Sequence, residues 1–450
     1  MISKQIFSRD YLPTINLAIP VVLSQVGQVI VQLVDNAMVG VLGSDSLAAV
    51  SFAGALFFVF FLFCGGMSMG LTPLVGEMYS KGSHRISAIY LQNSVVLYTL
   101  LSLVVFALMR VVGGCMHLFG QEEAVVELAR PYFNYVAWSI IPFMIFGAFK
   151  QFLEGLGNTK VAMVIVLTSN VINIFFNYLL IYGNWGFEAM GAAGAGLATL
   201  ISRIITPILI VSYFANKEKF RRYFALFNRK NLNFEWIKSL VKVGLPISLQ
   251  LLMEGGVFSI VSIMMGWIGS KELAANQIAL SMANFAFMIV LGVGAATTIR
   301  ISHAYGRRDF ESMRNIARSS LRMGIVYNVI TALIFIFTRN YIPLIFTDDA
   351  RVVEIASLLL ICVAVWQFSD GLQIITQGVL RGVRDVNTTV VIAFISYILV
   401  TLPVGYTCAF VFGMSAPGLW VGFIIGLGLA AVLLSLRWRK VFRQLRQSKE

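Results

Sequence analysis

Three carboxylates interrupt otherwise apolar stretches of this chain: Asp35, Glu254 and Asp370. An ionisable side chain at the centre of a bilayer costs at least about 2.5–3.5 kcal/mol, so it needs a partner or a wet cavity. A carboxylate at such a depth can bind a substrate cation, a sodium ion or a proton. The three residues are therefore predicted to be functional, because hydrogen bonding between helices does not require a charge.

Each carboxylate shares a helical face with polar or aromatic residues, since positions three or four apart along a helix are neighbours. The three faces are Ser24, Gln28, Gln32 and Asp35; Gln250, Glu254 and Ser262; and Trp366, Asp370, Gln373 and Gln377. Together these faces are predicted to line a central polar cleft. For the uncharged members, the alternative is hydrogen bonding between neighbouring helices.

Two asparagines and one arginine are further candidates. Asn173 and Asn177 lie one turn apart in another apolar stretch. They either hydrogen-bond a neighbouring helix or help to bind a cation near Asp35, since amide oxygens suit hard cations. Arg203 is predicted to be the only basic residue at depth, and it either pairs with Asp35 or faces the cytoplasmic end of its helix. Glu77, near the end of an apolar stretch, is expected to be solvated.

The stretches that position these residues are predicted to be membrane-spanning helices. The chain is 58% hydrophobic and 12% charged, whereas soluble proteins carry about 25% charged residues. A spanning helix needs about 20 mostly apolar residues. Twelve are predicted, centred near residues 25, 62, 101, 142, 172, 201, 252, 287, 329, 366, 400 and 426. The first stretch lacks a small-residue cleavage site, so it is expected to be a retained span and not a signal peptide.

The lysines and arginines indicate the orientation. Twelve spans put both chain ends on one side of the membrane, and 27 of the 34 basic residues then fall in the loops and tails of that side. Cytoplasmic loops carry this excess of positive charge, so both termini are predicted to be cytoplasmic. The net charge of +13 is spread over alternate loops and not over one face, which argues against nucleic-acid binding.

A repeated segment divides the chain into two halves. MVGVLGSDSLAAVSFA at 38–53 matches MMGWIGSKELAANQIA at 264–279, at an offset of 226 residues. Halves of six spans each insert with the same orientation, so their symmetry axis is expected along the membrane normal. The predicted fold is an all-α integral membrane protein with twelve transmembrane helices in two pseudo-symmetric six-helix lobes around a central cleft. The lobes are residues 1–213 and 239–450, joined by a basic cytoplasmic linker at 214–238.

With these motifs the chain resembles the multidrug and toxic compound extrusion (MATE) transporters of the NorM type, over about residues 10–435. The residues that carry the resemblance are LVDNAMVGVLGSDSLAA at 33–49, LEGLGNTK at 153–160, NVINIFFNYLLIYG at 170–183, GAAGAGLATLISR at 191–203, MEGG at 253–256, MMGWIGSKELAANQIA at 264–279 and SDGLQIITQGVLRGVRD at 369–385. The resemblance implies two lobes around a cleft and cation-coupled antiport of amphiphilic, often cationic drugs.

The resemblance also implies roles for individual residues. Glu254 and Asp370 fall at the C-lobe cation site, as sodium ligands if the ion is Na⁺, with Trp366 where the family has a tyrosine. Asp35, Asn173 and Asn177 fall at the N-lobe polar site, where some relatives carry a second aspartate in place of Asn177. The remaining candidates are Gln28 and Gln32 for the N-lobe site, and Gln250, Gln373, Gln377 and Ser262 for the substrate cleft.

The predicted function is therefore multidrug efflux by antiport with Na⁺ or H⁺, with alternating access of the two lobes. No cofactor is expected, and the protein is predicted to be a monomer in the inner membrane of a bacterium. The alternative within the same superfamily is a flippase of lipid-linked oligosaccharides, although such cavities need basic residues for pyrophosphate, and here the candidates are acidic. An intramembrane enzyme would require a nucleophile with a base, or a metal cluster, at depth, and neither is visible in the sequence.

Overall fold

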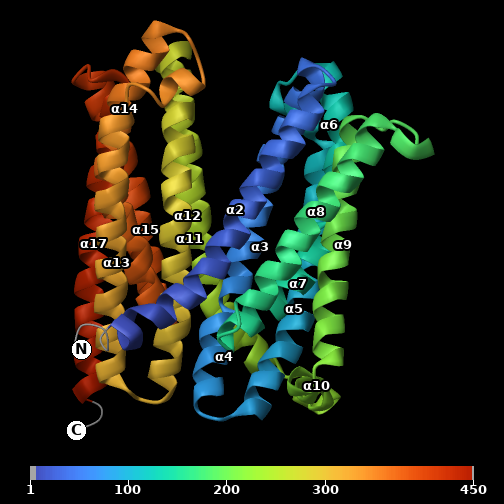
Figure 1. The fold of residues 1–450 in the computed structure, drawn as a ribbon, viewed down its shortest axis with the longest axis vertical. Coiled ribbons are helices and arrows are strands. Elements are labelled where there is room, and N and C mark those ends of the chain that lie inside the picture. Colours follow the sequence, from blue (N-terminus) through green and yellow to red (C-terminus); the bar gives the residue numbers. More distant parts are fainter. Residues whose placement is uncertain (1–6, 448–450) are drawn as a thin grey trace. The chain divides into compact units, whose positions relative to one another are not determined.

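A computed structural model describes residues 7–447, which form long helices joined by turns (Figure 1). Twelve helical segments are long and apolar enough to cross a membrane, and each contains one of the twelve predicted centres. The segments are Arg9–Gly40, Ser44–Ser80, His84–Gly114, Glu123–Gly155, Lys160–Tyr182, Ala192–Asn216, Phe234–Ile268, Ser270–Gly306, Phe310–Thr338, Ala350–Gly382, Asn387–Val411 and Ser415–Gln447. The prediction of an all-helical fold with twelve membrane helices is confirmed.

Several spans consist of more than one helix. In the first half the helices are η1 (Phe7–Tyr11), α2 (Leu12–Gly40), α3 (Ser44–Met69), α4 (Leu71–Ser80), α5 (His84–Gly114), η2 (Met116–Phe119), α6 (Glu123–Trp138), α7 (Ile140–Gly155), α8 (Lys160–Tyr182), η3 (Asn184–Gly186) and α9 (Ala192–Asn216). Helices α10 (Glu218–Ala225) and η4 (Arg229–Asn231) follow, and the second half contains α11 (Phe234–Ile268), α12 (Ser270–Gly306), α13 (Phe310–Thr338), η5 (Pro343–Ile345), α14 (Ala350–Gly382), α15 (Asn387–Ala393), η6 (Phe394–Thr401), α16 (Leu402–Tyr406), η7 (Thr407–Val411) and α17 (Ser415–Gln447).

The eleventh span departs from regular α-helix geometry. Its segments η6 and η7 are π-helical, and the hydroxyl of Thr401 donates to the carbonyl of Ser396, five residues earlier, at 2.9 Å. The wider turn rotates the residues that follow it around the helix axis, and π-helical turns occur often at functional sites. Tyr397 lies within η6 and is fully buried.

The chain folds into two compact units whose boundaries differ from the predicted lobes. The N-terminal unit comprises Leu23–Ser248, and the C-terminal unit comprises Leu249–Glu450 together with Met1–Val22. Helix α2 therefore begins in the C-terminal unit and α11 begins in the N-terminal unit. The predicted lobe 1–213 and the compact unit Leu23–Ser248 therefore have different boundaries, because contacts in space and not chain order define a compact unit.

Close helix crossings hold each exchanged segment within its unit. In the N-terminal unit, a Cβ on Gly66 would lie 2.5 Å from the Cα of Ser248, and the hydroxyl of Ser248 donates to the carbonyl of Phe63 at 2.8 Å. In the C-terminal unit, a Cβ on Gly292 would lie 2.4 Å from Val22. Both pairs are related by the same 226-residue offset as the repeated segment, so the repeat preserves this crossing.

Polar contacts add to the crossing in the C-terminal unit. Arg300 on α12 donates to the carbonyl of Asp10 at 2.6 Å and to the hydroxyl of Thr14 at 2.5 Å. Ser319 on α13 also donates to the carbonyl of Asp10, at 3.2 Å. These bonds tie the beginning of the first span to α12 and α13.

The predicted linker is folded onto the N-terminal unit. Phe220 and Tyr223 of α10 are buried, and the hydroxyl of Tyr223 lies 3.2 Å from Nδ1 of His84. Burial, and then the neighbouring Tyr79, raise the pKa of Tyr223 to about 12, so its hydroxyl stays protonated at neutral pH. The segment after α10 is anchored as well, since the side chain of Asn93 donates to the carbonyl of Asn231 at 3.0 Å.

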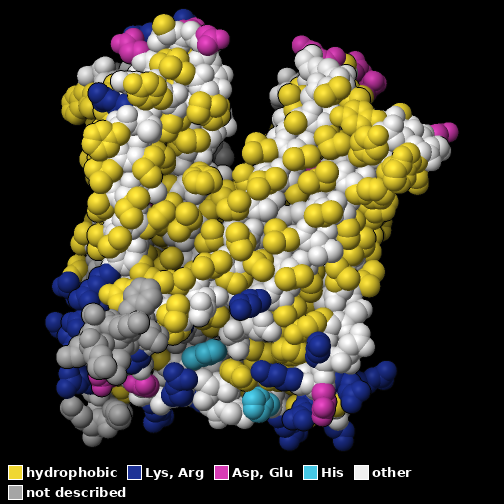
Figure 2. Space-filling model, viewed as in Figure 1, with side chains coloured by type: hydrophobic (Ala, Val, Ile, Leu, Met, Phe, Trp, Pro, Cys, Tyr) yellow, Lys and Arg dark blue, Asp and Glu magenta, His cyan; other side chains and the backbone are white. Residues whose placement is uncertain are grey.

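Charged side chains occupy opposite ends of each unit. Figure 2 shows most Lys and Arg side chains at one end of each unit, which in the N-terminal unit is the end that carries α10, and most Asp and Glu side chains at the other. Between the two ends the visible surface is mainly hydrophobic. This distribution is typical of membrane proteins whose basic loops face the cytoplasm.

The crossing at Gly66 leads to a test of stability. Replacement of Gly66 by Ala should destabilise the protein by about 1–3 kcal/mol, because the added methyl group meets backbone and not a flexible side chain. The neighbouring Gly65→Ala is the matched control, since nothing lies within 4 Å of its Cβ position. Thermal unfolding of the purified proteins in detergent should show a lower midpoint for Gly66→Ala alone. Equal midpoints for the two variants would contradict the close crossing.

Candidate functional site

Two of the three predicted carboxylates lie together in the C-terminal unit. Glu254 on α11 is 9% exposed and Asp370 on α14 is 2% exposed. The two side chains are close enough to interact electrostatically. Buried like charges repel in a medium of low dielectric constant, so the pair is stable only when a cation, a proton or a fixed positive group compensates it.

Tyr397 joins the two carboxylate helices to the eleventh span. The side chain of Gln373 donates to the hydroxyl of Tyr397, and that hydroxyl makes a side-chain hydrogen bond with Glu254. The π-helical segment η6 carries Tyr397, so the geometry of this span brings the hydroxyl to the site. Sequence reasoning missed Tyr397, whose only signal was a tyrosine within an apolar stretch.

Arg381 also belongs to this site, which corrects the prediction that Arg203 is the only basic residue at depth. Arg381 lies in the last turn of α14, and its Nη2 lies 3.4 Å from Oε1 of both Gln250 and Gln377. Its charge also interacts with Glu254. The prediction failed because a long arginine side chain reaches well beyond its own backbone position. The spacing Asp370, Gln373, Gln377, Arg381 continues the predicted face and was the available signal.

Several buried polar atoms of this site have no hydrogen-bond partner among residues 7–447. Two are acceptors, Oδ1 of Asp370 and Oε1 of Gln373. Since buried polar groups are normally paired, acceptors of this kind suit a cation or a proton. The remaining atoms are donors: Nε2 of Gln250, Nε1 of Trp366 and Nε of Arg381. The residues therefore fit a small hydrated cation or a protonated carboxyl group, with water as the partner of the donors.

Trp366 is buried one turn before Asp370 in an aromatic cluster. Its ring centroid lies 6.1 Å from that of Phe258 and 5.9 Å from that of Trp420, both in edge-to-face geometry. The indole of Trp420 is fixed by a 3.0 Å hydrogen bond to Asn276. The cluster packs one side of the site with aromatic rings, and a cation–π role for Trp366 stays a prediction.

The residues predicted for a substrate cleft lie in two different places. Gln250, Gln373 and Gln377 are all buried inside the C-terminal unit, where their side chains bond to Arg381 or Tyr397. They belong to the surroundings of the carboxylates, and contact with a substrate stays a prediction. Ser262 lies two turns beyond Glu254, and its hydroxyl donates to the carbonyl of Phe258 at 3.0 Å.

The third predicted carboxylate, Asp35, belongs to a separate hydrogen-bond network in the N-terminal unit. The amide nitrogen of Asn177 donates to Asp35 at 2.5 Å and to Oδ1 of Asn173 at 3.3 Å. Asn173 in turn donates to Thr199 on α9 at 3.4 Å. The structure therefore brings Asp35, Asn173 and Asn177 together, as predicted. The amide oxygen of Asn177 is buried without a partner among the described residues, which leaves one acceptor beside the carboxylate.

Arg203 interacts electrostatically with Asp35, but its direct contacts are with other residues. Its guanidinium donates to the hydroxyl of Ser139 at 2.8 Å and lies 4.8 Å from the ring centroid of Phe57, with Phe61 and Phe143 each 5.7 Å away. Its interaction with Asp35 is electrostatic and is not a direct salt bridge. A guanidinium is more weakly hydrated than an ammonium and stacks on aromatic rings, so these contacts can hold it at depth.

The other predicted residues of the first helix differ in exposure. Gln28 and Gln32 are exposed, whereas Ser24 is buried. Glu77 also differs from its prediction, since it is 3% exposed and not solvated. Its carboxylate forms a 2.5 Å salt bridge with Lys81, one turn further along the chain.

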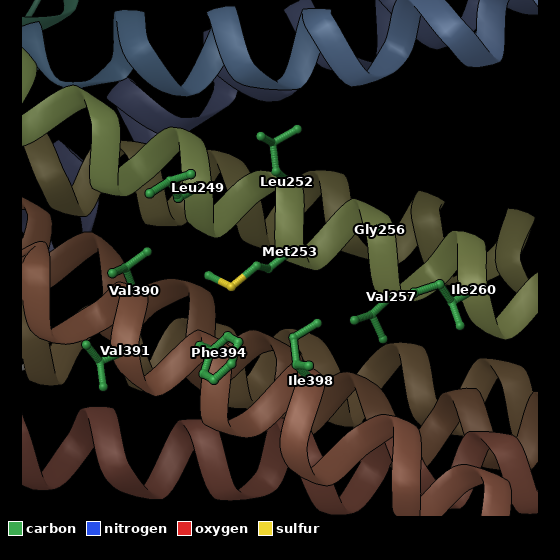
Figure 3. A pocket seen from close by; sticks show the side chains of 10 residues that line it. All are labelled: Leu249, Leu252, Met253, Gly256, Val257, Ile260, Val390, Val391, Phe394 and Ile398. Atoms are coloured by element: carbon green, nitrogen blue, oxygen red, sulfur yellow. The ribbon is translucent and has the colours of Figure 1, made fainter.

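An apolar groove of about 470 Å³ lies beside the carboxylate site in the C-terminal unit (Figure 3). It is lined by Leu249, Leu252, Met253, Gly256, Val257, Ile260, Val390, Val391, Phe394 and Ile398. Met253 and Phe394 come from the same two helical segments, α11 and η6, that carry Glu254 and Tyr397. Because its lining is entirely apolar, the groove has no groups that could bind an ion.

Comparison with known proteins identifies the family. The sequence pattern of the MatE family matches residues 20–179 and 246–407. The chain is 34% identical over 436 residues to the probable multidrug resistance protein NorM of Xylella fastidiosa strain 9a5c, which covers 97% of this chain and 93% of that protein. It is 31% identical over 444 residues to the multidrug resistance protein NorM of Vibrio vulnificus strain YJ016, which covers 97% of both.

A solved structure has the same fold. The eukaryotic MATE transporter AtDTX14 superposes with a TM-score of 0.88 at 20% identity, over 98% of this chain and 99% of that one. This chain therefore belongs to the MatE family. Members of the family are transporters and not enzymes.

The network at Asp35 leads to a second test of stability. Replacement of Asn177 by Leu should destabilise the protein by about 1–3 kcal/mol, because Asp35 loses the donor that satisfies its carboxylate. Asn170→Leu on the same helix is the control, since its buried amide nitrogen has no partner among the described residues. Thermal unfolding in detergent should separate the two variants, and an unchanged midpoint for Asn177→Leu would argue against the network.

Proposed function

We propose that this protein exports amphiphilic, often cationic compounds by antiport with Na⁺ or H⁺. The names of its relatives, multidrug resistance proteins with 31–34% identity over nearly the full length, support efflux of small molecules. The bacterial sources of those relatives and the twelve candidate spans support a multi-pass protein of a bacterial membrane. We place it in the inner membrane, as a monomer that needs no cofactor.

The observation that carries this proposal is the buried pair Glu254 and Asp370, with the unpartnered acceptor Oδ1 on Asp370. An ionised carboxylate can only accept hydrogen bonds or bind a cation. Helix packing alone does not require two buried carboxylates. The free energy of burying them is unfavourable, and a cation that binds there in each transport cycle offsets it. If the ion is Na⁺, the carboxylate oxygens of both residues are its ligands.

Coupling requires that the cation bind two states of the protein with different affinities. In the proposed cycle, drug is bound while Glu254 and Asp370 lack a cation. A cation from outside then binds the pair and favours the state that releases drug outward, and alternating access of the two lobes returns the cation to the cytoplasm. Asp35, with Asn173 and Asn177, forms the N-lobe site, which contributes a second protonation site or a contact with drug.

The orientation of the chain is part of the proposal. The end of each unit that gathers Lys and Arg is placed in the cytoplasm, as the positive-inside rule requires (Figure 2). Both termini are then cytoplasmic. A flippase of lipid-linked oligosaccharides fits less well, because Arg203 is held by Ser139 and three phenylalanine rings and is not offered to a pyrophosphate.

The direct test is transport by purified protein in liposomes. A Na⁺ gradient and a pH gradient are imposed separately, and movement of ethidium is followed by fluorescence. We expect transport under at least one gradient, and the effective gradient identifies the ion. No drug movement under either gradient would contradict drug antiport, and labelled lipid-linked sugars would then be the substrates to test.

Neutralising the carboxylate pair should abolish coupling. Glu254→Gln or Asp370→Asn should reduce gradient-driven transport at least tenfold and weaken drug binding much less, because the cation and not the drug loses its ligands. Asp35→Asn should also impair transport. Ser259→Ala is the control and should transport normally, because Ser259 is exposed and its hydroxyl donates to the carbonyl of Gly255 in the same helix. Full gradient-driven efflux by the Glu254 and Asp370 variants would refute the assignment.

A further inference from the structure

A third charged group, Arg381, interacts with one member of the carboxylate pair, Glu254. The guanidinium of Arg381 lies 3.4 Å from Gln250 on α11 and 3.4 Å from Gln377 on α14. Gln250 precedes Glu254 by one helical turn, and Arg381 interacts with Glu254 electrostatically. A guanidinium stays protonated in proteins. The site therefore contains a permanent cation that belongs to the chain itself.

The charges of this site can be counted. Glu254 and Asp370 each contribute one negative charge when ionised, and Arg381 contributes one positive charge. The site then carries one net negative charge, and among the described residues no other charged group is found to interact with the pair. Uncompensated charge is costly in a buried environment. One monovalent cation therefore makes the site neutral, whereas two would leave it positive.

The packing of the helices does not explain the arginine. The internal repeat aligns Leu380-Arg381-Gly382 with Leu153-Glu154-Gly155, with a slip of one residue. In the N-terminal unit that position is a buried glutamate, and Lys150 lies 3.8 Å from its carboxylate. The two halves thus carry opposite charges at this place, and the positive charge belongs to the C-terminal unit alone.

We propose that Arg381 is a built-in counter-ion that limits the carboxylate pair to one coupling cation in each transport cycle. This inference rests on the proposed antiport function. Arg381 acts as a positioning and charge-balancing residue. It contacts the glutamines beside the carboxylates, and its fixed charge takes the place of a second bound cation.

The test measures how many cations leave when drug binds. Ethidium affinity of the purified protein in detergent is determined at a series of Na⁺ concentrations at fixed pH, and at a series of pH values at fixed Na⁺. The slope of log Kd against log cation concentration gives the number of cations displaced per drug, by linkage. Any cation that binds at Asp35 adds the same amount to the slope of every variant. The test therefore compares the slopes of the variants with that of the wild type.

Four variants follow the charge count. Arg381→Gln should raise the slope by one relative to wild type, and Glu254→Gln should lower it by one. The double variant Glu254→Gln, Arg381→Gln should return to the wild-type slope, and Arg381→Lys should keep it. Arg384→Gln is the matched control and should leave the slope unchanged, because Arg384 is not among the groups found to interact with Glu254 or Asp370, and its guanidinium lies 5.8 Å from the ring centroid of Tyr305.

The inference is overturned if Arg381→Gln binds ethidium with the wild-type slope. If Arg381→Gln fails to fold, Glu254→Gln is compared with the double variant instead. Equal slopes for those two proteins would also overturn the proposal that Arg381 is a counter-ion. A wild-type slope of zero for both cations would refute antiport itself, and with it the role of Arg381. A non-zero wild-type slope that no change at Arg381 alters would leave antiport standing and reject the counter-ion alone.

Discussion

The cost of charge in an apolar environment governs this structure. Each charged side chain at depth lies beside a group that lowers that cost, and the nature of that group differs from place to place. Asp35 accepts a hydrogen bond from the amide of Asn177, and Glu77 forms a salt bridge with Lys81. Arg203 donates to Ser139 and lies close to three aromatic rings. These three groups are compensated within the chain. The pair Glu254 and Asp370 is compensated only in part, and this is why we propose that a cation from solution binds there.

The internal repeat preserves packing more faithfully than chemistry. The crossing of Gly66 with Ser248 recurs as the crossing of Gly292 with Val22, and in both cases the first part of a long helix packs in the compact unit of the other half. A Cβ at Gly66 would meet the backbone of Ser248, and one at Gly292 would meet the side chain of Val22, so both positions leave no room for a side chain. The polar residues are freer to change, as Glu154 in one half and Arg381 in the other illustrate.

The π-helical turn of the eleventh span links backbone geometry to the site. It places Tyr397 where its hydroxyl can bond both Glu254 and Gln373, so that helices α11 and α14 and segment η6 meet at a single hydroxyl group.

The sequence by itself determined the twelve spans, the two-fold repeat and the three deep carboxylates, because hydrophobic length and the rarity of charge in lipid are properties of local composition. It also predicted that Asp35, Asn173 and Asn177 share a site, from helical spacing together with the family resemblance. Only the tertiary structure decided that the beginnings of α2 and α11 exchange units, that Tyr397 and Arg381 join the carboxylate pair, and that Arg203 is held by aromatic rings. Those outcomes depend on which helices are in contact and on how far long side chains extend. The periodicity of a single helix predicts neither.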